Sequence, residues 1–321
     1  MKISLLFVLA AVAALGIALR APLAVTVLGL VAFGVLHNVL ELRYVAGRFV
    51  LRRRLLFVLL GLITAIVLCR LAYLYVGEPA RYAEILVGYG VLAAACVQAL
   101  RGWRLAAAVL VLVVAAVASL GFPGYHFVIL AHLHNVVPLF FLWEWAGRLA
   151  RPGVFRWTQV AWVLGVPALV LAGAFDRVLG GVSGSTVAAF AGNPAPIIAA
   201  SAPPDSSTLV GARFLVVFAF LQTMHYFVWV YFMPRHAPEA PRFLLGWRAW
   251  ALGGGLGAAL AVLFVIDYAS GRALYGAFAS YHAYLEFPVL LALLLGPAGA
   301  GGSQLVFRET ASERQVPAAV S

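Results

Sequence analysis

The sequence predicts an all-α fold, a polytopic transmembrane bundle of about ten helices. The chain of 321 residues is 64% hydrophobic and 10% charged, with a mean hydropathy of +1.02, so a soluble fold would lack polar surface. Its apolar runs are close to the roughly 20 residues that a bilayer core requires. The runs are continuous and do not alternate with polar residues, which indicates helices and not the strands of a membrane barrel.

These apolar runs make up a single transmembrane domain, residues 1–296. The first run follows Lys2 as a signal peptide would, but Leu19-Arg20-Ala21-Pro22 is a poor cleavage site, so we expect a retained helix. The expected spans are residues 3–19, 23–46, 55–76, 82–100, 105–121, 124–147, 157–175, 207–233, 247–267 and 274–296.

Two segments lie outside the expected spans. Residues 176–206 are rich in Gly, Ala, Ser and Pro and too weakly apolar to cross a bilayer. We expect them to form a long external loop that folds as a lid or a short interfacial helix. Residues 297–321 begin Gly-rich and end polar, which predicts a disordered cytoplasmic tail.

The net charge of +11 reflects membrane topology and not nucleic-acid binding. Of the 22 Lys and Arg residues one is lysine, and most of the arginines lie in short loops between apolar runs. With ten spans, 16 basic residues fall on one side, while Arg20, Arg81, Arg177 and Arg272 fall on the other. This bias places both termini in the cytoplasm and favours an integral protein of a bacterial cytoplasmic (inner) membrane, with the lipid bilayer as its partner.

Polar residues inside the spans are costly and indicate function unless they are paired. Both cysteines (Cys69 and Cys96) lie in spans, so neither a disulfide nor a thiolate metal site is expected. Arg70 and Arg213 are interpreted as snorkelling or paired structural charges. Six of the seven histidines lie in spans, namely His37, His126, His132, His134, His225 and His282.

Four of these histidines share one depth in the membrane. His37, His134 and His225 precede a cytoplasmic arginine by 10 to 14 residues, which is roughly 15–21 Å of helix. His282 follows Tyr275, a residue expected at the outer boundary, by seven positions and so also falls near mid-membrane. The four spans run in the same direction. A lone intramembrane histidine usually bonds a neighbouring helix, but this convergence favours a metal site.

Two of the four histidines have an acidic partner one turn further along the helix. Glu41 follows His37, and Glu286 follows His282, each by four residues, which places each carboxylate on the same face as its imidazole. Such a carboxylate can ligate the metal or orient an imidazole. Phenols and rings nearby are expected to line a pocket for an apolar substrate: Tyr226, Trp229, Tyr281 and Tyr284.

The remaining intramembrane histidines are ambiguous. His126 lies nearer the outer boundary, where it is either an interfacial residue or a further ligand. His132 and His134 are about 200° apart around one helix, so both cannot face one centre. We favour His134, because residues 133–136 repeat the Leu-His-Asn-Val of residues 36–39.

The order of these motifs resembles the Brp/Blh-like family of membrane β-carotene dioxygenases. Leu36-His37-Asn38-Val39-Leu40-Glu41 is similar to the family's early Pro-His-Gly-x-x-Asp motif, with Glu in place of Asp. Its middle and late motifs are similar to Tyr125-His126-Phe127, Ala131-His132-Leu133-His134-Asn135, Met224-His225-Tyr226-Phe227 with Pro234-Arg235-His236, and His282-Ala283-Tyr284-Leu285-Glu286. The resemblance implies a helical membrane enzyme with histidine-held iron and a carotenoid or isoprenoid substrate.

The sequence therefore predicts a membrane metalloenzyme, an iron-dependent oxygenase that uses O2 on a lipophilic small molecule. Imidazole with carboxylate suits Fe(II), and Zn or Cu would also fit. The expected catalytic and metal-binding residues are His37, His134, His225, His282, Glu41 and Glu286, with His126 and His132 as further metal candidates. A haem-binding electron-transfer protein and a proton or metal-ion transporter are the alternatives. Walker, dinucleotide-binding and Gly-x-Ser-x-Gly motifs are absent from the sequence.

Overall fold

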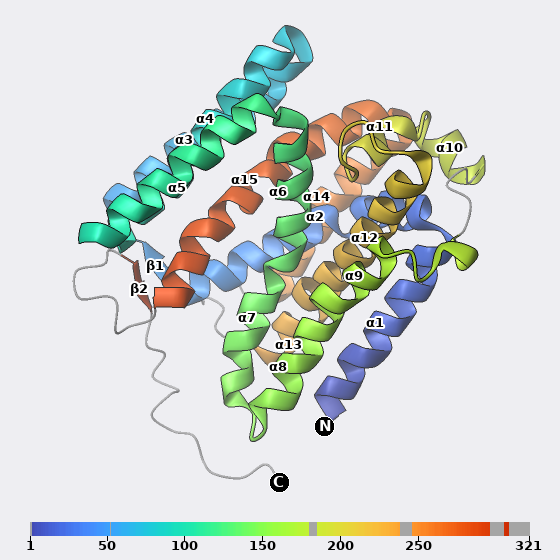
Figure 1. Cartoon of the computed structure of the whole chain (residues 1–321), viewed down its shortest axis with the longest axis horizontal. Helices are drawn as coiled ribbons and strands as arrows, with labels where there is room; N and C mark the ends of the chain where they lie inside the picture. Colours follow the sequence, from blue (N-terminus) through green and yellow to red (C-terminus); the bar gives the residue numbers. More distant parts are fainter. Residues whose placement is uncertain (1, 52, 180–184, 238–245, 296–304, 308–321) are drawn as a thin grey trace.

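Long helices make up nearly all of the molecule, which confirms the all-α class (Figure 1). The computed structural model describes residues 2–51, 53–179, 185–237, 246–295 and 305–307. The long helices, with the short segments that continue them, are α1 (Lys2–Arg20), α2 (Pro22–Arg48), α3 (Arg53–Val76), α4 (Glu78–Ala99), α5 (Gly102–Gly121), α6 (Pro123–Val136), α7 (Pro138–Trp145), η1 (Ala146–Arg148), α8 (Pro152–Val160), η2 (Ala161–Gly165), α9 (Val166–Leu171), α12 (Thr208–Tyr226), η4 (Phe227–Phe232), α13 (Met233–His236), α14 (Gly246–Ile266) and α15 (Tyr268–Leu295).

The molecule is an integral membrane protein. Within the described residues, nine helical segments are long and apolar enough to cross a bilayer. They are α1 to α5, α6 continued to η1, α8 continued to α9, α12 continued to α13, and α14. The helix α15, with 28 residues, is a further long helix and corresponds to the last expected span.

A short pair of strands was not predicted. Strand β1 (Phe49–Leu51) follows α2 and pairs antiparallel with β2 (Leu305–Phe307), with Val50 opposite Val306. The rest of the tail predicted to be disordered lies outside the described residues.

Proline and π-helical turns interrupt several spans. Pro138 has no N–H for the His134 carbonyl, so the expected helix 124–147 divides into α6 and α7 at Val137, three residues after His134. Pro288 lies inside α15, two residues beyond Glu286. The π-helical segment η4 continues α12 directly after Tyr226, and such π-turns often occur at functional sites.

The helix α12 lies at the centre of the bundle. It packs against α1, α2, α6 and α9, and 67% of its most apolar stretch is buried. Phe7 of α1 is fully buried and meets Phe155, Phe227 and Phe232 edge-on, so α1 is part of the core. The helices α3, α4 and α5 form a separate layer at one edge, and α1 lies at the opposite edge (Figure 1).

The expected external loop contains three short helical segments, η3 (Asp176–Val178), α10 (Ser185–Ala191) and α11 (Ala195–Ala199). The helix α10 contacts α2 and α15, and α11 contacts α12. The Arg272 guanidinium donates a hydrogen bond of 3.0 Å to the Pro196 carbonyl and so ties α11 to α15. These segments cover the end of the bundle that the arginine bias assigns to the external side, called here the outer side.

Arg70 and Arg213, interpreted from the sequence as snorkelling or paired charges, are both paired. Arg70 Nε lies 2.6 Å from a Glu84 carboxylate oxygen. Arg213 donates through Nε to Asp176 at 2.9 Å and through Nη1 to the Leu171 carbonyl at 3.0 Å. The Asp176–Arg213 pair therefore fastens η3 to the outer end of α12.

Asp176→Asn is expected to lower the melting temperature at neutral pH but not in acid. The hydrogen bonds from Arg213 hold the pKa of Asp176 below its ordinary value. The pair thus contributes stability above the unfolded-state pKa of about 3.9 and loses it as the pH falls through the lower folded-state pKa. Thermal unfolding in detergent should show a difference between wild type and Asp176→Asn at about pH 6 that becomes smaller as the pH falls below about 3.9. A difference that persists unchanged in acid would contradict this role.

Candidate metal centre

Four helices bring one histidine each to a common point. His37 comes from α2, His134 from α6, His225 from α12 and His282 from α15, and each offers a ring nitrogen within 4.8 Å of the other three. These are the four histidines that the depth argument placed in one layer. The structure brings His134 to this point and leaves His132, on the same helix, outside it.

The spacing of the ring nitrogens suits a single metal ion. The Nε2 atom of His282 lies 3.0 Å from Nε2 of His134 and 3.4 Å from Nε2 of His37. Imidazole nitrogens that are each about 2.1 Å from one ion lie about 3.0–3.4 Å apart in octahedral or tetrahedral geometry. The rings of His37, His134 and His282 are therefore spaced as ligands of one ion, and a ring nitrogen of His225 lies within 4.8 Å of them.

The hydrogen bonds of two rings direct their Nε2 lone pairs inward. His37 Nδ1 lies 2.9 Å from the Phe33 carbonyl, which can only accept, so this nitrogen carries the proton. His134 Nδ1 lies 2.9 Å from the Glu286 carboxylate, and an ionised Glu286 fixes the same tautomer. Both Nε2 atoms are then acceptors that face His282. A cation bound by both lone pairs would remove the electrostatic repulsion between them. In metal-bound histidines the other ring N–H usually donates to a carboxylate or a backbone carbonyl, as both Nδ1–H groups do here.

His225 closes the inner side of the cluster. Its side chain is fully buried, and neither of its ring nitrogens has a hydrogen-bond partner in the described part of the chain. A buried polar group without a partner is costly. A metal ion among the four rings would satisfy this imidazole, so the donor set fits a metal that prefers nitrogen ligands, such as Fe(II), Zn or Cu.

A glycine on α2 lets α15 approach closely enough to form the cluster. A Cβ added at Gly34 would lie 2.7 Å from the ring of Tyr275, so only glycine permits this contact. Gly34 is one turn before His37, and Tyr275 is two turns before His282. The contact therefore sets the distance between the two histidines.

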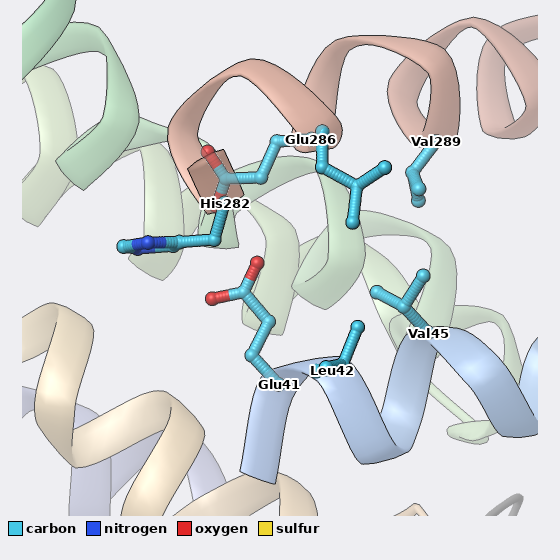
Figure 2. Close-up of a pocket in the computed structure, with 7 residues that line it drawn as sticks. Glu41, Leu42, Val45, His282, Glu286 and Val289 are labelled. Carbon is cyan, nitrogen blue, oxygen red and sulfur yellow. The ribbon is translucent and has the colours of Figure 1, made fainter. Parts of the chain in front are cut away.

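The two glutamates lie together beside His282 (Figure 2). Glu41 and Glu286 point toward each other across a cavity of about 10 Å³, and their carboxyl groups interact. Glu286 bonds His134, whereas a Glu41 oxygen lies 4.0 Å from Nε2 of His225. Glu286 is thus placed to orient a ligand, and both carboxylates are close enough to balance the charge of a bound cation.

Glu286→Ala is expected to weaken metal binding without abolishing it. The substitution removes the acceptor that orients His134, and losing such a partner lowers metal affinity by about 10- to 100-fold. Glu286→Gln keeps an acceptor and should retain more of the affinity. Competition with a chelator of known affinity measures the change, and equal affinities for wild type and Glu286→Ala would contradict the orienting role.

A large cavity connects the cluster with the outer side. It has a volume of about 1050 Å³, at the upper end of the range for small-molecule sites. His37, His134 and His282 line its inner part, while residues of α10 and α11 and of the turn between α14 and α15 line its outer part. A molecule in this cavity can therefore contact three of the four imidazoles.

Two polar residues next to the cluster also line this cavity. The Gln222 amide nitrogen lies 2.8 Å from the hydroxyl of Tyr226, whose ring centroid is 4.7 Å from that of His37. The buried Gln222 amide oxygen has no hydrogen-bond partner among the described residues. The sequence argument included Tyr226 but missed Gln222. An amide inside an apolar span, one turn before His225, is the signal that identifies it.

The other predicted pocket residues lie elsewhere. Trp229 is fully buried against Tyr44 and Phe141 and does not line the large cavity. The Tyr284 ring packs on Gly88 of α4, away from that cavity. The side chain of Tyr281 is outside the described part of the structure.

The structure does not bring His126 and His132 into the cluster. His126 bonds Ser119 at 3.0 Å and the Tyr284 hydroxyl at 3.2 Å, in a polar network among α5, α6 and α15. His132 donates through Nε2 to the Ser201 carbonyl at 2.7 Å and packs against Phe214 and Phe218. Hydrogen bonds use both ring nitrogens of His126 and the Nε2 atom of His132, so both residues are interpreted as hydrogen-bonded packing residues.

No family model, curated protein or solved structure matches this chain.

Proposed function

We propose that this chain is a membrane-embedded metalloenzyme, an iron-dependent oxygenase that acts on a lipophilic substrate. His37, His134, His225 and His282 would hold one Fe(II) ion. The observation that carries the proposal is the convergence of four buried imidazoles with spacings that suit metal ligands. Fe(II) in such a site would supply the activation of O2.

The residues around the centre would bind and position the reactants. Glu286 holds the His134 ring by its Nδ1–H, and Glu41 contributes a second negative charge beside His225. The apolar stretches of the large cavity would exclude water from the reacting part of the substrate. Gln222 and Tyr226 place an amide oxygen and a hydroxyl where they can bond a polar group of the reactants near His37.

The substrate class follows from the cavity. Its volume of about 1050 Å³ accommodates a long chain, and its walls combine aromatic and aliphatic residues with a few polar ones. This supports a carotenoid, isoprenoid or other lipid-like substrate, as the resemblance to the Brp/Blh-like family also implies. A bacterial inner membrane is the proposed location, because the helical bundle and its arginine bias are typical of that membrane.

The geometry of the site disfavours the two alternatives, a haem-binding electron-transfer protein and a transporter. Two nitrogen ligands on opposite faces of a haem lie about 4 Å apart, whereas Nε2 of His282 lies 3.0 Å from Nε2 of His134 and 3.4 Å from Nε2 of His37, which is too close for a macrocycle between them. A transporter would need polar residues on the inner side of the centre as well. There the described residues next to the glutamates are Leu42, Val45, Leu285 and Val289.

Nitric oxide, a probe of O2-binding positions, tests the proposal. Protein loaded anaerobically with Fe(II) should bind it and give a high-spin iron–nitrosyl signal in electron paramagnetic resonance. On exposure to air the iron-loaded protein should consume O2 faster when β-carotene or an unsaturated fatty acid is present. Iron that binds no nitric oxide and stays reduced in air would show a closed structural site and overturn the oxygenase proposal.

A further inference from the structure

We infer that the substrate is a chain lipid with an anionic headgroup, which Arg272 binds at the outer mouth of the cavity. The inference rests on the proposed function, because the other end of the bound chain must reach the four-histidine centre. It adds a headgroup, a binding residue and the position along the chain that meets the metal.

Arg272 is the cation available to such a headgroup. Its guanidinium lines the cavity, and its hydrogen bond goes to the Pro196 carbonyl of α11, which leaves further N–H donors unused. Within the described residues no carboxylate lies within ion-pair distance of it. A guanidinium with unused N–H donors favours bidentate binding of a carboxylate or phosphate.

The other charged groups of the cavity wall already have partners. Arg70 is paired with Glu84 at 2.6 Å and lies over the Phe127 ring. The Asp267 carboxylate accepts hydrogen bonds from the Ala269 N–H and the Ser270 hydroxyl, so it caps the first turn of α15. Arg70 therefore does not compete with Arg272 for an incoming anion, and Asp267 does not compete with that anion for Arg272.

A track of small residues leads from Arg272 to the centre. Gly276, Ala279 and Ala283 of α15 line the cavity at helical spacing, and a Cβ added at Gly276 would meet nothing within 4 Å. Small side chains on this face leave room for a chain to lie along the helix. Arg272 and His282 are ten residues apart on α15, which is about 15 Å.

That distance fixes the register of the bound chain. An extended chain advances about 1.2 Å per bond, as an extended polypeptide does. The atom that meets the metal should therefore lie roughly twelve bonds from the headgroup.

The test uses stearic acid with a nitroxide about twelve bonds from its carboxylate and the methyl ester of the same probe. Purified wild-type protein in detergent should immobilise the acid at about tenfold lower concentration than the ester, a difference of about 1.4 kcal/mol. Arg272→Gln should remove this preference, whereas Arg20→Gln, an exposed outer arginine that does not line the cavity, should keep it. Equal binding of acid and ester, or an unchanged preference in Arg272→Gln, would overturn the inference.

Two further measurements identify the anion that binds and the position of the chain that reaches the metal. The first uses competing lipids, and the second moves the nitroxide along the chain. Displacement of the probe by octadecanoate or by octadecyl phosphate identifies the anion, and displacement by neither overturns the inference. With Cu(II) in the four-histidine centre, relaxation of the nitroxide should be strongest for the label about twelve bonds from the carboxylate. A stronger effect for a label near the carboxylate or near the terminal methyl would contradict the register. Headgroup binding is measured without metal, so a failure to load Cu(II) would count against the proposed function alone.

Discussion

His282→Ala is expected to lower the affinity for Fe(II) or Zn by more than about 100-fold, beyond the loss typical of an orienting residue. The Nε2 atom of His282 is the one that lies within 3.4 Å of both His37 Nε2 and His134 Nε2. The substitution removes one metal ligand and leaves an empty space between the three remaining imidazoles. Affinity is measured by competition with a chelator, on protein shown to be folded by its thermal unfolding.

The matched control is His132→Ala. It removes the same side chain from α6, but His132 bonds the Ser201 carbonyl and does not reach the cluster. Metal affinity should remain within a factor of about three of wild type, the usual scatter of a distant substitution. Equal losses in the two variants, or none in His282→Ala, would show that the ligand set is wrong.

Gly88→Ala is expected to destabilise the fold by about 1–3 kcal/mol, the usual cost of overpacking. A Cβ at this position in α4 would lie 2.4 Å from the Tyr284 ring of α15. The ring cannot move away freely, because its hydroxyl bonds His126 Nε2 at 3.2 Å and the residue is buried. A lower melting temperature in detergent is the result expected.

Gly90→Ala provides the opposite control on the same helix. A Cβ there would meet the Leu62 side chain at 3.5 Å, an ordinary contact. Since alanine is a better helix former than glycine, this variant should be as stable as wild type or more so by up to about 1 kcal/mol. If both variants changed stability in the same direction, the packing of α15 on α4 would differ from that described.

The depth of the histidines could be predicted from the sequence because a helix rises uniformly. The count from each histidine to a cytoplasmic arginine 10 to 14 residues further along placed His37, His134 and His225 in one layer, and the structure brings these three together with His282. The choice of His134 over His132 depended on a weak internal repeat. It agrees with the structure because Glu286 of α15 faces His134, a contact between distant segments that sequence spacing cannot show.

The orientation of side chains around each helix could not be predicted. Tyr226 and Trp229 are three residues apart in a helix of unknown rotation, and one lines the large cavity while the other lies in the core. Tyr284 turns toward Gly88, because that glycine leaves space for its ring. Such choices depend on which small residues face each side chain from neighbouring helices.

The large cavity could not be predicted either. Its outer part is formed by α10, α11 and the turn before α15, which are distant in sequence and have no common pattern. The sequence predicted a lid or an interfacial helix for this loop, but not that its residues share a cavity with His37, His134 and His282. The strand pair β1–β2 was likewise missed, because three-residue strands leave no periodic signal.

Elemental analysis of purified protein after equilibration with Fe(II), Zn or Cu tests the central claim most directly. The four converging imidazoles predict about one tightly bound ion per chain in wild type. The same preparation of His282→Ala should contain little or none. Wild-type protein that is folded yet takes up none of the three metals would contradict the account.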